Sequence, residues 1–244
     1  MLKVEGLHSG YGRVPILRDI SLSVEPGEIV LVLGNNGAGK STLMKTIGGF
    51  IKPTAGTITL EGRSITGSAP EDIARLGLRL VLEGHRIFPE MSVRDNIRLG
   101  AMASSASMKQ ALALAEPALD VFPVLREKMT AQARELSGGQ QQMLALAQAF
   151  VARPKVLLAD EISLGLAQAL IPPILRFLRS WADQGTAVLL VEQQIETALA
   201  LADRALVIER GEVRIQSTAA QLRDSPQIRN IYLGLPEDDE DGGL

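Results

Sequence analysis

The sequence predicts an α/β protein whose core is a mainly parallel sheet. Short, entirely apolar runs alternate with helical segments, and such runs are typical of strands buried on both faces of a parallel sheet. They are IVLVL, VLLA and AVLLV, at residues 29–33, 156–159 and 187–191. The first run leads into a glycine-rich loop ending in Lys40 and Ser41, which indicates a strand, a loop and a helix in succession.

The first third of the chain predicts further strands. Residues 4–28 and 54–65 combine Val, Ile and Thr with Gly and Pro at the boundaries, a pattern typical of short strands joined by turns. From about residue 69 the composition becomes helical, with segments rich in Ala, Leu, Met and Gln at 92–121 and 138–152.

A further helical stretch, 168–183, separates the last two apolar runs. We therefore expect a single domain over residues 1–235, in which a mainly helical insertion at 84–152 interrupts the α/β core. The ending PEDDEDGGL, at 236–244, predicts an acidic, disordered tail.

Charge and composition limit the functional classes. The 244 residues include 25 Lys and Arg and 28 Asp and Glu, which gives a net charge of −3, and five of the acids lie in the tail. Without those five acids the rest of the chain has a net charge of +2, so its charge gives no reason to expect a nucleic-acid partner. The sequence has no cysteine, which is consistent with a reducing cytosol, and its N-terminus predicts no secretory signal. Its apolar runs are far shorter than the roughly 20 residues of a membrane helix, so a membrane role requires a partner.

The loop after the first apolar run has the spacing GxxxxGKS, called Walker A. Gly34, Gly37 and Gly39 allow backbone N–H groups to turn inward around a triphosphate, and the following helix N-terminus favours an anion. Lys40 would reach the phosphates, and the Ser41 hydroxyl would bind Mg²⁺. A glycine-rich turn without a ligand is the alternative, but it leaves the Lys-Ser pair unexplained.

Two acids follow the run VLLA directly, as in a Walker B motif. Alternate side chains of a strand point in opposite directions, so Asp160 and Glu161 are expected to differ in role. Asp160 would hold Mg²⁺, and Glu161 would orient and activate the attacking water. A strand that ends in solvated acids is the alternative, which the phosphate loop makes less attractive.

The segment RELSGGQQQMLALAQAF lies between these two motifs and resembles the LSGGQ signature of ABC ATPases. The resemblance covers residues 2–235 and implies a P-loop NTPase cassette with an N-terminal antiparallel β part and a helical signature subdomain. In this family the signature contacts the ATP held by a second cassette. We therefore expect two cassettes to meet head to tail around two ATP molecules.

The resemblance extends to further positions. Tyr11 stands where an aromatic residue stacks on adenine, although a strand-edge tyrosine is the alternative. Glu83 stands at the Q-loop position, where it would bind Mg²⁺ or its water, or face outward as a plain charge. Gln193 stands at the switch position, usually histidine, where it could donate a hydrogen bond to the γ-phosphate without carrying a charge. Its alternative is a solvated strand end. The segment 87–97 resembles the surface where a permease's coupling helix docks.

The motifs and the resemblance together imply ATP and Mg²⁺ as cofactors and four groups of residues. The catalytic residues are Lys40, Glu161 and Gln193. The residues expected to bind ATP are Tyr11, Gly34, Asn35, Asn36, Gly37, Ala38, Gly39, Lys40, Ser41 and Thr42. The signature residues are Ser137, Gly138, Gly139 and Gln140. The residues expected at the metal are Ser41, Asp160 and Glu83.

Further motifs narrow the resemblance. SLGLA, LLVEQ, ADRALVIERGEV and IYLGL are similar to the ATP-binding subunits of branched-chain amino-acid ABC importers, in particular the LivF-like one. This implies an active ATPase on the cytoplasmic face of the inner membrane. Its expected partners are transmembrane permease subunits, a second cassette and, indirectly, a solute-binding protein. The resemblance favours a paralogue over an identical chain as the second cassette.

Several alternatives remain. Related cassettes serve importers of urea, amides and other small polar solutes. A soluble ABC ATPase of DNA repair or the ribosome would carry a coiled-coil insertion or two cassettes, and this chain carries neither. A P-loop kinase or GTPase leaves the signature unexplained. A degenerate cassette is disfavoured by Lys40 and Glu161.

The sequence departs from the family pattern at three positions where the family usually has proline. Leu82, Ile162 and Gln168 stand where proline is usual. Each replacement frees φ and restores a backbone N–H, so we expect looser or differently bonded loops.

Overall fold

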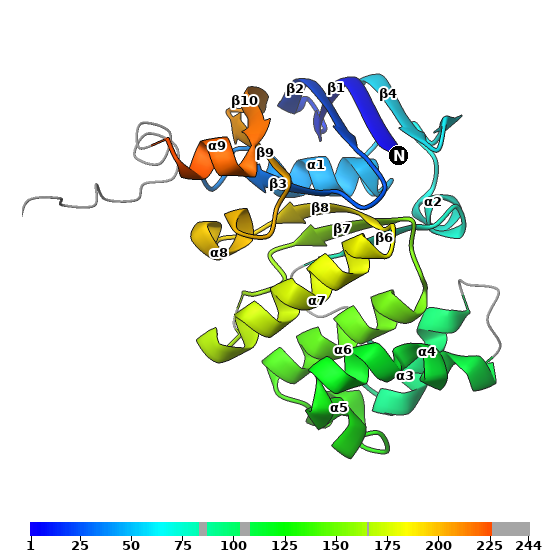
Figure 1. Cartoon of the computed structure of the whole chain (residues 1–244). Coiled ribbons are helices and arrows are strands. Elements are labelled where there is room, and N and C mark those ends of the chain that lie inside the picture. Colours follow the sequence, from blue (N-terminus) through cyan, green and yellow to red (C-terminus); the bar gives the residue numbers. More distant parts are fainter. Residues whose placement is uncertain (83–86, 103–107, 165, 226–244) are drawn as a thin grey trace, which may run out of the picture.

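The protein contains one antiparallel and one mainly parallel β-sheet, with helices between and beside them (Figure 1). The computed structural model describes residues 1–82, 87–102, 108–164 and 166–225. The α/β class and the N-terminal antiparallel part are therefore confirmed. Glu83 and the tail at 236–244 lie outside the described residues.

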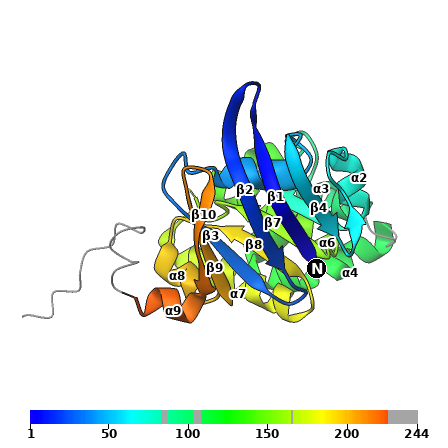
Figure 2. The ribbon, with the colours of Figure 1, turned by 90° about the horizontal axis from the view of Figure 1, so that it is seen from above.

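The antiparallel sheet has the strand order β2-β1-β4-β5. Apolar and polar residues alternate along β1, because one face of the sheet is buried and the other meets solvent. The hairpin of β1 and β2 extends beyond the rest of the ribbon (Figure 2). The four strands are β1 (Leu2–Tyr11), β2 (Val14–Val24), β4 (Ala55–Leu60) and β5 (Arg63–Ser64).

The second sheet has the order β10-β9-β3-β8-β7-β6, and only β10 runs antiparallel to its neighbour among these strands. Its strands are β3 (Ile29–Leu33), β6 (Leu78–Val81), β7 (Val156–Asp160), β8 (Ala187–Val191), β9 (Arg204–Glu209) and β10 (Glu212–Thr218). The three apolar runs of the sequence form its central strands β3, β7 and β8, as predicted.

One prediction was wrong in detail, because β6 lies inside the region expected to be helical from about residue 69. Its four residues pair in parallel with β7 at the edge of the sheet. The run is too short and too mixed, with Arg79 in its middle, to identify a strand from the sequence. Pairing with a distant strand decides its conformation here.

Both faces of the six-stranded sheet are buried at its strands β3, β8 and β7. Along β3, Ile29 and Leu31 belong to one core cluster, whereas Val30 and Val32 belong to the other. The second cluster fills the space between the two sheets, which also contains α1 (Lys40–Ile47) (Figure 1). This burial explains why these strands are uninterrupted apolar runs.

The first helix after β5 packs through Ile73 against the cluster between the sheets, whereas the later helices cover the other face or extend away from it. They are α2 (Pro70–Arg75), α3 (Val93–Ala101), α4 (Met108–Val121), α5 (Pro123–Glu127), α6 (Gly138–Val151) and α7 (Ile171–Asp183), followed by α8 (Ile195–Leu199) and α9 (Ala219–Arg223). Short 3-10 helices occupy Ala133–Glu135 and Gln168–Leu170. Within the described residues, no helix has the combination of length and apolar character needed to cross a bilayer.

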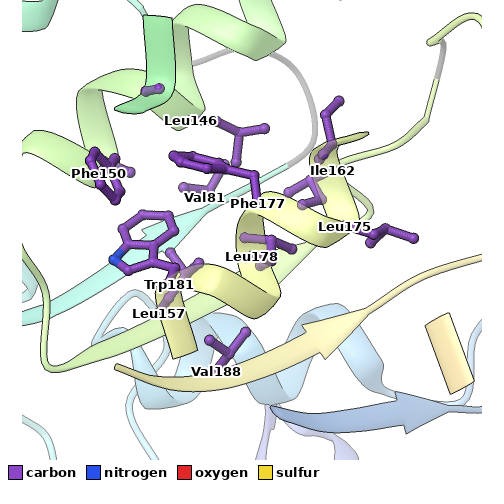
Figure 3. Close-up of a cluster of buried hydrophobic side chains, with 14 of the residues drawn as sticks. Val81, Leu146, Phe150, Leu157, Ile162, Leu175, Phe177, Leu178, Trp181 and Val188 are labelled. Atoms are coloured by element: carbon purple, nitrogen blue, oxygen red, sulfur yellow. The ribbon is translucent and has the colours of Figure 1, made fainter. Parts of the chain in front are cut away.

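Aromatic rings join the helical segment to the core sheet. Phe150 of α6 packs between Phe177 and Trp181 of α7, with ring centroids 4.9 and 5.1 Å away (Figure 3). Such offset or edge contacts add to the energy of area burial, by about 0.5–1.5 kcal/mol per pair. They hold α6, whose first turn carries the signature, at a defined position relative to the sheet.

Candidate nucleotide site

The candidate site lies where the parallel strands end. Val191, the last residue of β8, pairs with Val32 of β3 on one side and with Asp160 of β7 on the other. The segments that follow these three strands therefore leave the sheet side by side. They are the glycine-rich loop, the acidic segment beginning at Glu161 and the polar run at 192–194.

The loop after β3 adopts backbone conformations that require glycine. Gly34, Gly37 and Gly39 have φ angles of 149, 81 and 111°. A Cβ on Gly34 would also lie 2.2 Å from the carbonyl oxygen of Ile208, so no other side chain fits there. Gly39 caps α1 without a side-chain hydrogen bond, which leaves the first N–H groups of this helix for a ligand.

Lys40 lies over the loop. Its Nζ donates hydrogen bonds to the carbonyl oxygens of Gly34, at 2.7 Å, and Asn35, at 3.2 Å. Partial burial lowers the pKa of Lys40, and the nearby carboxylates of Glu161 and Asp160 oppose this shift. The ammonium group is thus held among the loop and both acids.

Asp160 and Ser41 form a pair with metal-binding character. Asp160 is 3% exposed, and Ser41 hydrogen-bonds its side chain. Burial raises the pKa of Asp160, the Ser41 bond opposes the shift, and Glu161 adds to it. Its Oδ1 is buried without a hydrogen-bond partner among the described residues. An unpaired carboxylate oxygen beside a hydroxyl fits Mg²⁺, which takes one or two protein ligands together with water and phosphate oxygens.

Glu161 occupies a strained position. Its φ is 50°, which is uncommon for a residue with a side chain, and its N–H donates to the Val191 carbonyl oxygen at 2.9 Å. Gln193 Nε2 donates to Glu161 Oε2 at 2.8 Å. The structure therefore brings Glu161 and Gln193 together, although 32 positions separate them.

A cavity of about 300 Å³ lies beside these groups. Most of the predicted phosphate-loop residues and the acid Glu161 line it together. The lining residues are Ile16, Asn36, Gly37, Gly39, Lys40, Ser41, Thr42 and Glu161. A second cavity of about 240 Å³ meets the other side of the loop and is lined by Gly34, Asn35 and Ala38, among others.

Two groups of predicted residues lie apart from these cavities. Tyr11 ends β1, is 51% exposed and is not among the lining residues. Ser137 caps α6, accepting from the N–H of Gln140 while Gln140 Oε1 accepts from the N–H of Ser137. Ser137 and Gly138 are exposed, and a Cβ on Gly139 would lie 3.0 Å from Leu166 Cδ2. The signature thus does not line the cavities beside this chain's own phosphate loop.

The sequence did not single out three residues of the site. Ile16 of β2 lines the main cavity, and no motif marks it because it resembles any strand residue. Ser163 N–H donates to Glu192 Oε1 at 3.1 Å, and the Ser163 hydroxyl bonds Glu192 Oε2. A polar residue at the end of an apolar run was the available signal for Glu192.

The positions that lack proline are packed or bonded. Ile162 is fully buried and lies in the cluster that contains Leu175 and Phe177 (Figure 3). Leu82 is buried as well, and Gln168 Oε1 accepts a hydrogen bond from Gln194 at 3.2 Å.

A larger, mainly apolar groove of about 560 Å³ lies between the sheet edge and the helices. It is lined by residues of α2, β6, α3 and α6 and by the segment after α1, of which only Glu71, Arg79 and Gln148 are polar. The helices approach closely at its base, since a Cβ on Gly100 would lie 2.2 Å from the Gln148 carbonyl oxygen. Phe50, at its margin, is 51% exposed.

The site combines a glycine-rich loop that opens a helix with a lysine that lies over this loop. It also has a Ser-Asp pair and an acid, Glu161, directly after β7. These features define a P-loop nucleotide-binding protein. Within this class, residues 17–163 match the family model described as ABC transporter. The chain therefore belongs to the ABC transporter family.

Curated relatives match over nearly the full length. The chain is 39% identical over 234 residues to the high-affinity branched-chain amino acid transport ATP-binding protein BraG of Pseudomonas aeruginosa, covering 96% of this chain and 100% of the relative. It is 33% identical to a probable branched-chain amino acid transport ATP-binding protein, LivF, of Archaeoglobus fulgidus, covering 96% and 99%.

A solved structure described as the ATP binding subunit of an ABC transporter superposes with a TM-score of 0.85. Its sequence is 28% identical, and the alignment covers 96% of each chain. The fold is that of an ABC ATP-binding cassette.

Proposed function

We propose that this chain is the ATP-hydrolysing subunit of an ABC importer for branched-chain amino acids. The observation that carries the proposal is a cavity lined by Lys40, Ser41 and Glu161, in which Ser41 is hydrogen-bonded to Asp160 and Glu161 to Gln193. The names of the two relatives, both matched end to end, support the amino-acid substrate.

The phosphate loop would bind the triphosphate through backbone N–H groups from Gly34 to Thr42 and through the helix N-terminus. Asn35, Asn36 and Ala38 contribute as parts of this backbone, because they line the cavities on either side of it. Lys40 would exchange its carbonyl partners for phosphate oxygens, which offer a full negative charge. Tyr11 would stack on adenine from the exposed hairpin.

Ser41 and Asp160 would hold Mg²⁺, and Glu83 is proposed to join them. Mg²⁺, when bound, supplies positive charge that neutralises phosphate oxygens. The raised pKa of Asp160 reflects the cost of its burial, which a cation or Lys40 offsets.

Glu161 would accept a proton from the attacking water while Gln193 orients the carboxylate through its 2.8 Å bond. Gln193 Nε2 could alternatively donate to the γ-phosphate. Catalysis would consist mainly of positioning and charge stabilisation.

The signature would act on a second cassette's ATP. Support comes from Ser137 and Gly138, which are exposed and do not line this chain's phosphate cavity. Two chains facing head to tail would each supply one phosphate loop and one signature, and a paralogue is the proposed partner.

The apolar groove would receive a helix of a permease subunit. Relatives are named as ATP-binding proteins of transport systems, so the membrane-crossing part would belong to other chains. A helix with an apolar face fits a groove with few polar residues and an exposed phenylalanine at its margin. The cassette would therefore sit on the cytoplasmic face of the inner membrane, with a solute-binding protein acting across it.

The direct test is Glu161→Gln in the full chain. We expect ATP binding to remain, since the phosphate loop is untouched, and hydrolysis to fall by roughly 10²–10⁴-fold through loss of the proton acceptor. Binding is measured with a fluorescent ATP analogue, and turnover by phosphate release. Near-normal turnover would remove Glu161 from the catalytic role.

The transport role is tested by purification of the tagged chain from native membranes. We expect copurification with a multi-span permease and uptake of leucine rather than urea by the reconstituted complex. A stable complex with ribosomes or DNA instead would favour the soluble ABC ATPase.

A further inference from the structure

The segment after β7 and the segment after β8 are joined by a ladder of side-chain hydrogen bonds. Each residue of the polar run 192–194 reaches across to the other segment. The bonds are Glu192 with Ser163, Gln193 with Glu161, and Gln194 with Gln168. The two outer bonds, of Gln193 and Gln194, are exposed, whereas the bonds between Glu192 and Ser163 are buried.

The buried contact is the strong member of this ladder. Glu192 is 4% exposed and Ser163 is 5% exposed. Both carboxylate oxygens of Glu192 accept from the same residue, one from the Ser163 N–H and one from its hydroxyl. Charge-assisted bonds away from water are stronger than exposed neutral ones and fix an orientation as well as a distance.

The position of this contact relates it to the proposed chemistry. Glu192 directly precedes Gln193, and Ser163 follows Glu161 by two residues. An exposed bond between two long side chains is weak and mobile by itself, because water competes for both groups. The bonds between Glu192 and Ser163 tie together the two backbone segments that carry Gln193 and Glu161. This contact limits how far the Gln193 and Glu161 side chains can separate.

We propose that Glu192 is a positioning residue for ATP hydrolysis, and that its bidentate contact with Ser163 keeps Gln193 against the Glu161 carboxylate. This inference rests on the proposed function of Glu161. Glu192 does not line the phosphate cavity. Within the described part of the chain, its carboxylate bonds Ser163 and not the lining residues Lys40 or Ser41. Its removal should therefore alter kcat and leave the KM for ATP nearly unchanged.

The test is steady-state hydrolysis by the full chain assembled with its partner subunits in vesicles. Glu192→Ala should lower kcat about tenfold, since loss of alignment at a reacting group has effects of this order or larger. Glu192→Gln should recover kcat to within about twofold, because its amide can accept from the Ser163 N–H and donate to the hydroxyl. Ser163→Ala keeps the backbone N–H donor but loses the hydroxyl, so its kcat should lie between those of Glu192→Ala and Glu192→Gln.

Thr186→Val provides a matched control for loss of a buried hydrogen bond. Thr186 lies at the opposite end of β8, and its hydroxyl donates to the Pro154 carbonyl oxygen at 3.0 Å. This variant should lower the unfolding temperature without changing kcat. A Glu192→Ala variant that behaves in the same way would overturn the positioning role.

A double-mutant cycle tests whether the effect on kcat runs through this one contact. Glu192→Ala and Ser163→Ala each remove hydrogen bonds of the contact, and their effects on kcat should be less than additive because the two residues share it. Additive effects would contradict the inference. If the cycle is additive but the wild-type complex hydrolyses ATP and Glu161→Gln abolishes that hydrolysis, only the role of Glu192 is overturned and the proposed function stands. A wild-type complex that does not hydrolyse ATP would overturn the proposed function and the role of Glu192 together.

Discussion

The end of the parallel sheet and the apolar groove differ in how they are built. The site at the sheet end is polar, and its cavity of about 300 Å³ is shaped by glycine backbone, by Lys40 and Ser41, and by the acid Glu161 that follows β7. The groove, at about 560 Å³, is mainly apolar and is assembled from four separate helices and strands and the segment after α1. The first contains groups that can act on a phosphate, whereas the second is mainly apolar surface with Glu71, Arg79 and Gln148 as its polar residues.

This difference indicates that two separate regions of the chain are suited to two tasks, phosphate chemistry at the sheet end and the burial of a partner's surface at the groove. Chemistry requires groups at fixed distances, so the site uses short backbone segments tied directly to strand ends. The proposed docking of a permease helix requires area and shape, which helix faces that approach closely at Gly100 can supply. Changes in one region should therefore leave the measured property of the other region intact.

The largest effect is expected from Asn96→Ala, on the groove side. Asn96 is fully buried, and its amide bonds both the N–H and the carbonyl oxygen of Phe88 as well as the Ser92 carbonyl oxygen. Leaving these groups unpaired should lower the free energy of unfolding by about 3 kcal/mol. Urea unfolding measures this change.

Arg94→Ala, an exposed change on the same helix, is the control and should stay within about 0.5 kcal/mol. The folded Asn96→Ala protein should keep its affinity for ATP. A lost affinity for ATP would show that the two regions are not separable.

Phe50→Glu should weaken assembly with the permease by roughly 30-fold, or about 2 kcal/mol, since a charge would replace an exposed aromatic ring at the groove margin. Hydrolysis by the free chain should not change. Competition binding with labelled wild-type chain measures the affinity. Met102→Glu alters an exposed apolar residue outside the groove lining and should have no effect; equal losses in both variants would exclude the groove as the docking site.

Gln193→Ala should slow hydrolysis about tenfold, or about 1.4 kcal/mol, because Glu161 would lose its orienting partner. The KM for ATP should stay the same. The pH profile should contain no inflection near 6.5 from this position, since an amide does not titrate. Gln194→Ala, which removes an exposed bond to Gln168, is the control, and an unchanged rate in Gln193→Ala would reduce Gln193 to a solvated strand end.

The sequence predicts the sheet end better than the groove. The apolar runs predict β3, β7 and β8. The spacing of the Walker A motif predicts the glycines Gly34, Gly37 and Gly39, whose φ angles are all above 80°. These features are local, so spacing along the chain identifies them. The contact of Ser163 with Glu192 spans 29 positions, and its geometry depends on the pairing of β7 with β8.

The groove and β6 could not be predicted for a related reason. The lining of the groove comes from residues as distant as Phe50 and Ala149, and each resembles an ordinary apolar residue of its own element. β6 becomes a strand only because β7 lies beside it. Tertiary packing, rather than local preference, decides both features.

The hydrogen bonds of Lys40 to the carbonyl oxygens of Gly34 and Asn35 have a thermodynamic consequence. Glycine loses more conformational freedom on ordering than any other residue, and this loop contains three glycines within six positions. Because the lysine crosses the loop and the sheet anchors one end of it, that entropy is lost during folding. A nucleotide would then meet a loop that is already ordered, so less of the interaction energy would be used to order it.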